Sequence, residues 1–222
     1  MVQQDQNQLK LKQIKYNIMK ILRITFAALL MFGFTNVHAQ KIKVTKGDLS
    51  FLKGQTSVLL EFDYSSMAVG KFDKEEDYVN KKVAEMNDKK PGSGDEWHEK
   101  WVADRDGRFH PKFEELCNKY TSKANCNFDQ TNINAKYTAI VKVTFTEPGF
   151  NVGVVRKDAS IDLEISFVET ANHDNVLAVM TMTKVPGRDA MGNDYDTGYR
   201  ISEAYAKAGK EFGAYLVKKA FK

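Results

Sequence analysis

Residues 159–169 read ASIDLEISFVE, and this stretch decides which fold the sequence predicts. Its apolar residues fall on alternate positions from Ile161 to Phe167, and Asp162, Glu164 and Ser166 lie between them. A period of two is typical of a β-strand that buries one face and leaves the other in water. We therefore predict a strand here, in a sheet with one polar face.

Further strands are expected on both sides of this stretch. Residues 137–147 alternate in the same way, and a Pro-Gly pair ends the pattern. Downstream, residues 172–175 form a turn signal, so residues 176–184 should pair antiparallel with 159–169. The inward side chains expected from 137–147 are Ala139, Val141, Val143 and Phe145. Weaker strand candidates lie at residues 42–45, 57–64 and 126–128.

Three helices are predicted between the strand candidates at residues 57–64 and 126–128. Asp73 opens the first, Asp95 is the expected N-cap of the second, and Pro111 suits the first turn of the third. Gly107 should interrupt the helical structure between the second and the third helix.

A long helix over residues 199–221 closes the chain, and its small residues Gly209 and Gly213 are expected to let it lie close against the sheet. These elements together predict an α+β fold. It is a mainly antiparallel sheet of about four to five strands with helices packed on one face, closing with a long C-terminal helix.

The segment MKILRITFAALLMFGFTNVHAQ, residues 19–40, is typical of a secretory signal peptide. A basic start leads into an apolar run, and a small-residue exit ends at Ala39. Cleavage between Ala39 and Gln40 leaves residues 40–222 as a single α+β domain. The expected location is the periplasm, or else outside the cell or at the outer membrane.

A retained membrane anchor is the alternative to cleavage. A spanning helix needs about 20 mostly apolar residues, whereas the run from Ile24 to Val37 holds fourteen and includes Asn36. No Cys follows the run to accept a lipid, and we expect no membrane span after leader removal. Residues 1–18 either lengthen the leader or lie upstream of a true start at Met19.

The charge of the chain depends on its leader. The whole sequence has 33 Lys and Arg against 29 Asp and Glu. Residues 1–39 hold five of the basic residues and one acidic residue, which leaves 28 of each sign in the remainder. A formally neutral domain lacks the basic excess expected of a nucleic-acid-binding protein, so we predict no nucleic-acid partner.

Cys117 and Cys126 are the only cysteines. Because an exported protein meets an oxidising compartment, we favour a structural disulfide between them. Closing so short a loop stabilises the fold by about 2.5–3 kcal/mol. Free thiols are the alternative, and the spacing matches neither a redox dithiol nor a zinc site.

Trp97 and Trp101 form the candidate recognition patch, since exposed aromatic side chains commonly anchor partner proteins or sugar rings. Ordinary packing is the alternative. His98 and His110 lack a metal-ligand spacing, and the acidic stretches near residues 104 and 196 fail the calcium-loop pattern. We therefore predict no metal, no cofactor and no catalytic residue.

Three segments carry a family resemblance: AKYTAIVKVTFTEPGF (135–150), DASIDLEISFVETANHDNVLAV (158–179) and YRISEAYAKAGKEFGAYL (199–216). Together they resemble the second half of bacterial envelope domains such as the amino-terminal domain of the translocation protein TolB and the lipoprotein activators of penicillin-binding proteins. The glycine usual in the family's hairpin is absent here, where residues 167–177 make a longer turn. The resemblance implies a fold and an envelope protein as partner, and it transfers no catalytic motif.

The function expected from the sequence is that of an exported cell-envelope protein acting as a non-enzymatic binding module, with an envelope protein as its partner. An envelope hydrolase or saccharide-binding protein is the alternative, suggested by the aromatic and acidic stretches. A third hypothesis is a structural assembly joined through a sheet edge. The sequence does not predict the oligomeric state.

Overall fold

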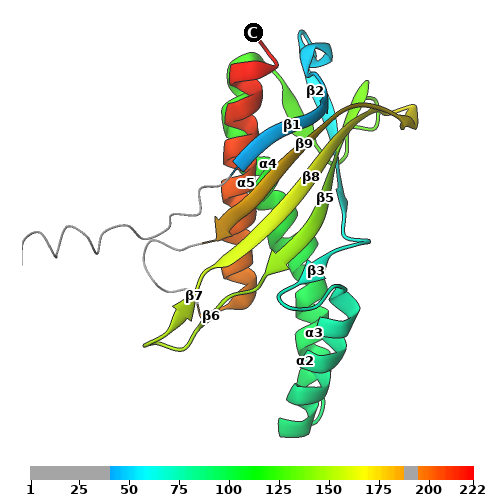
Figure 1. The fold of residues 1–222 in the computed structure, drawn as a ribbon. Coiled ribbons are helices and arrows are strands. Elements are labelled where there is room, and N and C mark those ends of the chain that lie inside the picture. The colour runs from blue at the N-terminus through cyan, green and yellow to red at the C-terminus, as the bar shows by residue number, and fades with distance from the viewer. Residues whose placement is uncertain (1–40, 188–194) are drawn as a thin grey trace, which may run out of the picture. The chain divides into compact units, whose positions relative to one another are not determined.

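The structure is a computed structural model that describes residues 41–187 and 195–222 (Figure 1). The leader and the cleavage site at Ala39 and Gln40 lie outside the described residues. One hydrophobic core lies between a β-sheet and the helices on one of its faces. Fully buried members of this core include Phe113, Phe167, Tyr205 and Phe212.

The main sheet has seven strands in the order β1-β9-β8-β5-β2-β4, and β3 pairs separately with β5. The strand bounds are β1 (Lys41–Gly47), β2 (Ser57–Asp63), β3 (Ala68–Val69), β4 (Asn127–Asp129), β5 (Tyr137–Glu147), β8 (Ala159–Glu169) and β9 (Asn172–Gly187). A separate hairpin is formed by β6 (Phe150–Asn151) and β7 (Arg156–Lys157). The α+β class is confirmed.

The expectation of four to five mainly antiparallel strands is wrong in its detail, because the sheet is mixed and larger. Neighbouring strands in the order β1-β9-β8-β5 are antiparallel, as predicted for β8 and β9. β2 is parallel to both of its neighbours, β4 and β5, and β3 is parallel to β5. Parallel strands need a long crossover. The helices between β2 and β5 form that crossover, and strand periodicity alone does not reveal it.

A register shift in β5 reverses part of the predicted inward set. Ala139, Val141 and Val143 are fully buried, as expected. The pairing of β5 with β8 slips between Val143 and Phe145. A β-bulge of this kind turns the following side chains to the opposite face. Phe145 is therefore only half-buried, and Thr146 is buried in its place, with its hydroxyl 3.1 Å from the Met67 sulfur.

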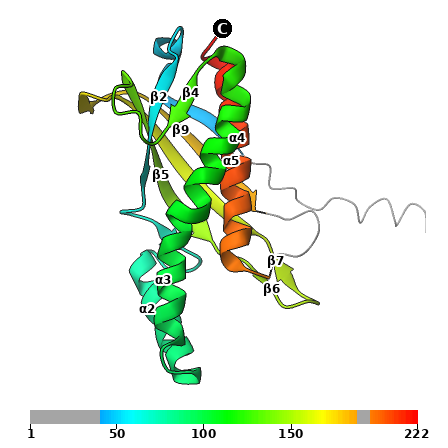
Figure 2. The ribbon, with the colours of Figure 1, turned by 180° about the vertical axis from the view of Figure 1, so that it is seen from behind.

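Two helices cover one face of the sheet (Figure 2). They are α4 (His110–Thr121) and α5 (Thr197–Lys219), and they pack against each other along their length. Gly209 and Gly213 of α5 contact α4 rather than the sheet, which corrects the sequence-based expectation. A Cβ on Gly209 would lie 2.1 Å from the Phe113 carbonyl oxygen, and one on Gly213 would lie 2.6 Å from that of Cys117.

The remaining helices, α2 (Glu75–Lys89) and α3 (Ser93–Asp104), form a helical hairpin beside β3. Each begins away from its predicted opening residue. Lys74 is the N-cap of α2, and Gly92, in a left-handed conformation, is the N-cap of α3. Gly107 does not interrupt the helical structure. It lies in a π-helical turn, Arg105–Phe109, that joins α3 directly to α4, so the acidic stretch around Asp104 is helical.

Candidate functional site

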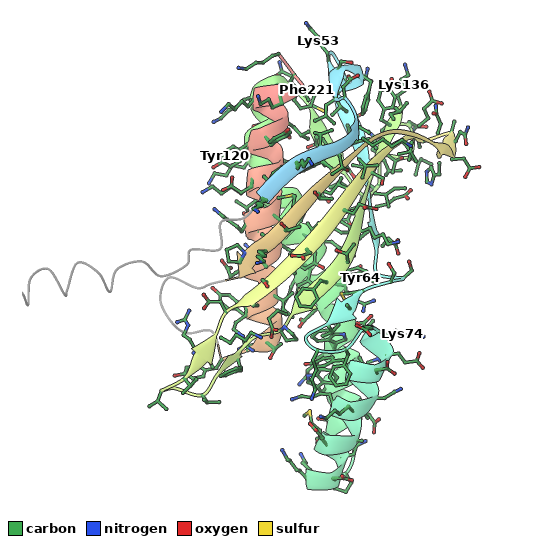
Figure 3. The ribbon with its side chains drawn as sticks, viewed as in Figure 1. Lys53, Tyr64, Lys74, Tyr120, Lys136 and Phe221 are labelled. Atoms are coloured by element: carbon green, nitrogen blue, oxygen red, sulfur yellow. The ribbon has the colours of Figure 1, made fainter. Side chains whose placement is uncertain are left out.

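A pocket of about 540 Å³ lies where the sheet meets the α2–α3 hairpin. We call it the junction pocket, and its walls are residues 64–67, which follow β2, and residues 73–76, which begin α2. The two walls are joined by a backbone hydrogen bond of 2.9 Å from the Glu75 amide to the Met67 carbonyl. Figure 3 shows Tyr64 and Lys74 at this junction.

The residues that line the junction pocket are polar apart from Met67, and its charged residues are acidic apart from Lys74. Its side chains are the carboxylates of Asp73, Glu75 and Glu76, the hydroxyls of Tyr64, Ser65 and Ser66, the ammonium of Lys74 and the thioether of Met67. Carboxylates and hydroxyls suit a ligand that donates hydrogen bonds, such as an ammonium, a guanidinium or a sugar.

A chain of hydrogen bonds lies behind Tyr64. The Tyr205 hydroxyl donates to the Tyr64 hydroxyl over 3.1 Å, and the Tyr64 hydroxyl lies 3.0 Å from His110 Nε2. On its other side, His110 Nδ1 lies 3.0 Å from the Asp106 carboxylate. These contacts fit a neutral imidazole that donates from Nδ1 to Asp106 and accepts from Tyr64 at Nε2. The Phe62 ring stacks on His110 with centroids 3.9 Å apart.

Glu75 is held by two donors. Its Oε1 accepts from Trp101 Nε1 over 2.5 Å and from the Arg105 guanidinium. The same guanidinium lies over the Tyr64 ring, 4.2 Å from its centroid. Arg105 therefore links the two halves of the network, and Glu75 and Tyr64 are fixed in position before any ligand arrives.

Burial keeps the two phenols and the imidazole of this network neutral. It raises the pKa of Tyr64 and of Tyr205 well above the ordinary value for a phenol. It also lowers the pKa of His110, because the effect of burial exceeds that of the nearby Asp106 carboxylate. A phenol with a raised pKa is a weak nucleophile at neutral pH. The arrangement therefore favours positioning and binding over covalent chemistry.

The two tryptophans of the predicted recognition patch have different environments. Trp101 is buried, with 6% of its surface exposed, and it serves the network through Glu75. Trp97 is half-buried and stacks on Trp101 with ring centroids 5.5 Å apart, and Tyr78 packs against both. Trp97 is thus the member of the pair with surface left for a partner.

Cys117 and Cys126 are both buried and carry free thiols in the structure. Burial raises the pKa of both, to about 11 for Cys126. A thiolate at Cys126 would also raise the pKa of Cys117, so the two thiol groups are near enough to interact electrostatically. Their disulfide remains a prediction.

The structure separates the other polar residues that the sequence analysis considered. His98 is exposed on α3, whereas His110 is buried in the network. Among residues 41–187 and 195–222, no three His, Cys, Asp or Glu side chains are grouped to hold a metal ion. Asn193 and Asp194 lie outside the described residues. Asp196 caps α5 by accepting from the Tyr199 amide, and it pairs with Arg108.

The network was missed by sequence reasoning because its members come from distant parts of the chain. Tyr64 and Tyr205, for example, are separated by 141 positions. No local spacing links them to each other or to His110. Local signals exist only for parts of the network: Asp106 and His110 lie four positions apart, and the aromatic end of the pattern over 57–64 marks Tyr64 as a residue at a strand end.

Membrane-spanning character is not found in the described part of the chain. No helix there combines the length and the apolar composition needed to cross a bilayer.

Comparison with protein-family models and with curated proteins gave no match. Among solved structures, the PelC dodecamer from Paraburkholderia phytofirmans is 12% identical, over 79% of this chain and 99% of that chain, with a TM-score of 0.36. A variant of that dodecamer in another crystal form is 11% identical over the same shares, with a TM-score of 0.35. A likeness of this degree establishes neither a shared fold nor a shared function.

Proposed function

We propose that this chain is an exported cell-envelope protein that acts as a non-enzymatic binding module, and that the junction pocket is its ligand site. The observation that carries the proposal is the prearranged wall of the pocket. Tyr64 and Glu75 line it, and each is held from behind by a partly buried hydrogen-bond network. Fixing the contact residues in advance lowers the entropic cost of binding.

The ligand we propose is a basic side chain of an envelope protein. Three carboxylates and one ammonium line the pocket, and Arg105 already neutralises Glu75. Asp73 and Glu76 are therefore the charges offered to a Lys or Arg of the partner, with the serine hydroxyls as further acceptors. The sequence resemblance to envelope domains and the predicted leader support the same class of partner.

Capture from a native envelope extract tests the proposal. We expect the wild-type protein to retain a partner in stoichiometric amount and the double variant Asp73→Asn, Glu76→Gln to lose at least nine-tenths of it. The matched control is Asp88→Asn, Glu99→Gln, which removes two exposed carboxylates of the α2–α3 hairpin outside the pocket. A photo-crosslinking residue at Ser66 should label the same partner, and one at Ser122 should not. Equal capture by both double variants would contradict the proposal.

A saccharide ligand, bound or hydrolysed, is the second candidate. It is favoured by the presence of an aromatic ring, Tyr64, beside hydroxyls and carboxylates, the usual lining of a sugar site. Retention of a glycan instead of a protein in the capture experiment, or release of reducing sugar from envelope glycan, would favour this candidate.

A further inference from the structure

The hydrogen-bond chain behind the junction pocket ends on a side chain that can gain a proton. His110 is buried, and both of its ring nitrogens have partners, Asp106 at Nδ1 and the Tyr64 hydroxyl at Nε2. Among side chains with ordinary pKa values, histidine is the one that changes its charge closest to physiological pH. The charge of this ring therefore decides in which direction the hydrogen bond to Tyr64 points.

In the neutral ring the partners assign that direction. Nδ1 carries the proton, because the Asp106 carboxylate only accepts, and Nε2 is left as an acceptor. Tyr64 donates to Nε2 over 3.0 Å and accepts from the fully buried Tyr205 hydroxyl over 3.1 Å. Each hydroxyl proton of the chain thus has an acceptor, and the half-buried Tyr64 is held at the wall of the pocket.

A second proton on the ring reverses the hydrogen bond to Tyr64. Nε2 then donates, and the Tyr64 oxygen becomes the acceptor. The proton of the Tyr64 hydroxyl has to leave His110. Among the described residues, the hydrogen bond to Tyr64 is also the one that the Tyr205 hydroxyl makes. Whichever way the two hydroxyls turn, one of their protons loses its acceptor, so the protonated ring disturbs the position of Tyr64.

The groups that face the ring come from several elements. Tyr64 follows β2, Gln130 follows β4, and Arg105 and Asp106 belong to the π-helical turn. Asp106 and Gln130 favour the charged ring, and the positive charge of Arg105 opposes it. Burial has the largest effect and holds the pKa of His110 below its ordinary value. The ring is therefore neutral near pH 7 and gains its proton on acidification.

We propose that His110 is the proton sensor of the junction pocket, which holds a cationic ligand while this ring is neutral and releases it when the ring is protonated. The inference rests on the proposed function, because it takes the pocket as a site for a basic side chain. Two effects weaken binding in acid. The reversed hydrogen bond takes Tyr64 out of its fixed position, and a second cation beside Arg105 repels the ligand.

Nuclear magnetic resonance tests the reversal without any ligand. The protein is recovered from the envelope of cells grown on tyrosine labelled with carbon-13 at Cζ and on histidine labelled with nitrogen-15. Between pH 8 and pH 5, above the usual range of carboxyl groups, the Tyr64 signal should shift with the same midpoint as the His110 ring. It should not shift in His110→Gln, whereas His98→Gln, which removes an exposed histidine, should behave like the wild type.

A small cation tests the coupling to the pocket. The probe is N-acetylarginine methylamide, whose guanidinium stays charged at every pH used. Affinity and protonation are reciprocal, so saturating probe should lower the His110 midpoint by at least about 0.5 pH unit, which corresponds to about threefold weaker binding by the protonated protein. The uncharged analogue, N-acetylcitrulline methylamide, should leave the midpoint unchanged.

A second variant covers the case in which His110→Gln fails to fold. Asp106 has a side chain that is 92% exposed and favours the charged ring, so Asp106→Asn should fold normally and lower the pKa of His110. The pH at which the probe is released should fall with it. Release at an unchanged pH in this variant would overturn the sensor.

The two halves of the test separate the sensor from the proposed function. A Tyr64 signal that does not follow the titration of His110, or an unchanged His110 midpoint with the probe bound, would overturn the sensor and leave the proposed function standing. Equal binding of the probe by the wild type and by Asp73→Asn, Glu76→Gln, or no binding at any pH, would overturn the pocket as a cation site and the coupling with it.

Discussion

At the scale of single residues, His110 makes the stability of the fold depend on pH. Burial holds its pKa below the ordinary value of 6.5, against the opposing effect of Asp106 and with the help of Arg105. Below pH 6.5 the unfolded chain therefore binds a proton that the folded chain resists. The contribution is fully present above that pH and is lost as the pH falls toward the lowered pKa.

We expect the free energy of unfolding to fall as the pH decreases below 6.5, with a slope of up to about 1.4 kcal/mol per pH unit from this group. In His110→Gln this part of the slope should vanish, because the titrating group is gone. Urea denaturation at several pH values measures it. His98→Gln removes an exposed histidine and should keep the wild-type slope. Identical slopes for all three proteins would contradict the prediction.

Gly209 is a second residue whose effect can be stated in advance. A Cβ there would meet backbone atoms of Phe113 on the neighbouring helix, which cannot move aside as a side chain can. We expect Gly209→Ala to destabilise the protein by about 1–3 kcal/mol, although alanine is the better helix former. Gly107→Ala, where the added Cβ meets nothing within 4 Å, should cost nothing. Denaturation midpoints compare the two.

At the scale of elements, the α2–α3 hairpin depends on one hydrogen bond more than on the stacking of its rings. Trp101→Phe keeps an aromatic ring but removes the donor to Glu75, so we expect a loss of about 1.5–3 kcal/mol. Trp97 makes no side-chain hydrogen bond that the described residues show, and Trp97→Phe should cost less than about 1 kcal/mol. Thermal melts of the two variants test this, and equal losses would refute it.

The positions of the strands were predictable from the sequence. The pairing partners of the strands were less so. The bounds predicted for β5 and β8 agree with those observed, since alternation is a local property of the chain. The parallel pairs of β2 depend on where the helical crossover returns the chain, and no local pattern records that. The π-helical turn at Gly107 was likewise hidden, because a glycine inside helical periodicity normally indicates an end.

The candidate site was likewise only partly predictable from the sequence. Trp101 was named from its residue type, but its role is to hold Glu75 inside the protein. Arg105 lies four positions after Trp101, a helical spacing, but Glu75 lies 26 positions before it, and no local pattern links the tryptophan to that carboxylate. Sequence reasoning thus found a member of the site without finding the site.

At the scale of the whole molecule, the leader and the disulfide are tested together by the intact mass of the protein recovered from the envelope. We expect the mass of residues 40–222 less two hydrogens, and both hydrogens should return on reduction. If the thiols are reduced instead, burial and their raised pKa values predict slow alkylation in the folded state. A mass that includes residues 19–39 would contradict cleavage at Ala39.

The order of the strands in the sheet also determines when each strand can find its partner during synthesis. The ribosome releases the chain from its amino end, so β1 and β2 emerge first. The partner of β1 is β9, and both neighbours of β2, β4 and β5, follow the helical crossover. Neither early strand can pair until the carboxyl-terminal half exists. A newly made chain therefore stays open for most of its synthesis, which suits the export that we propose for this protein.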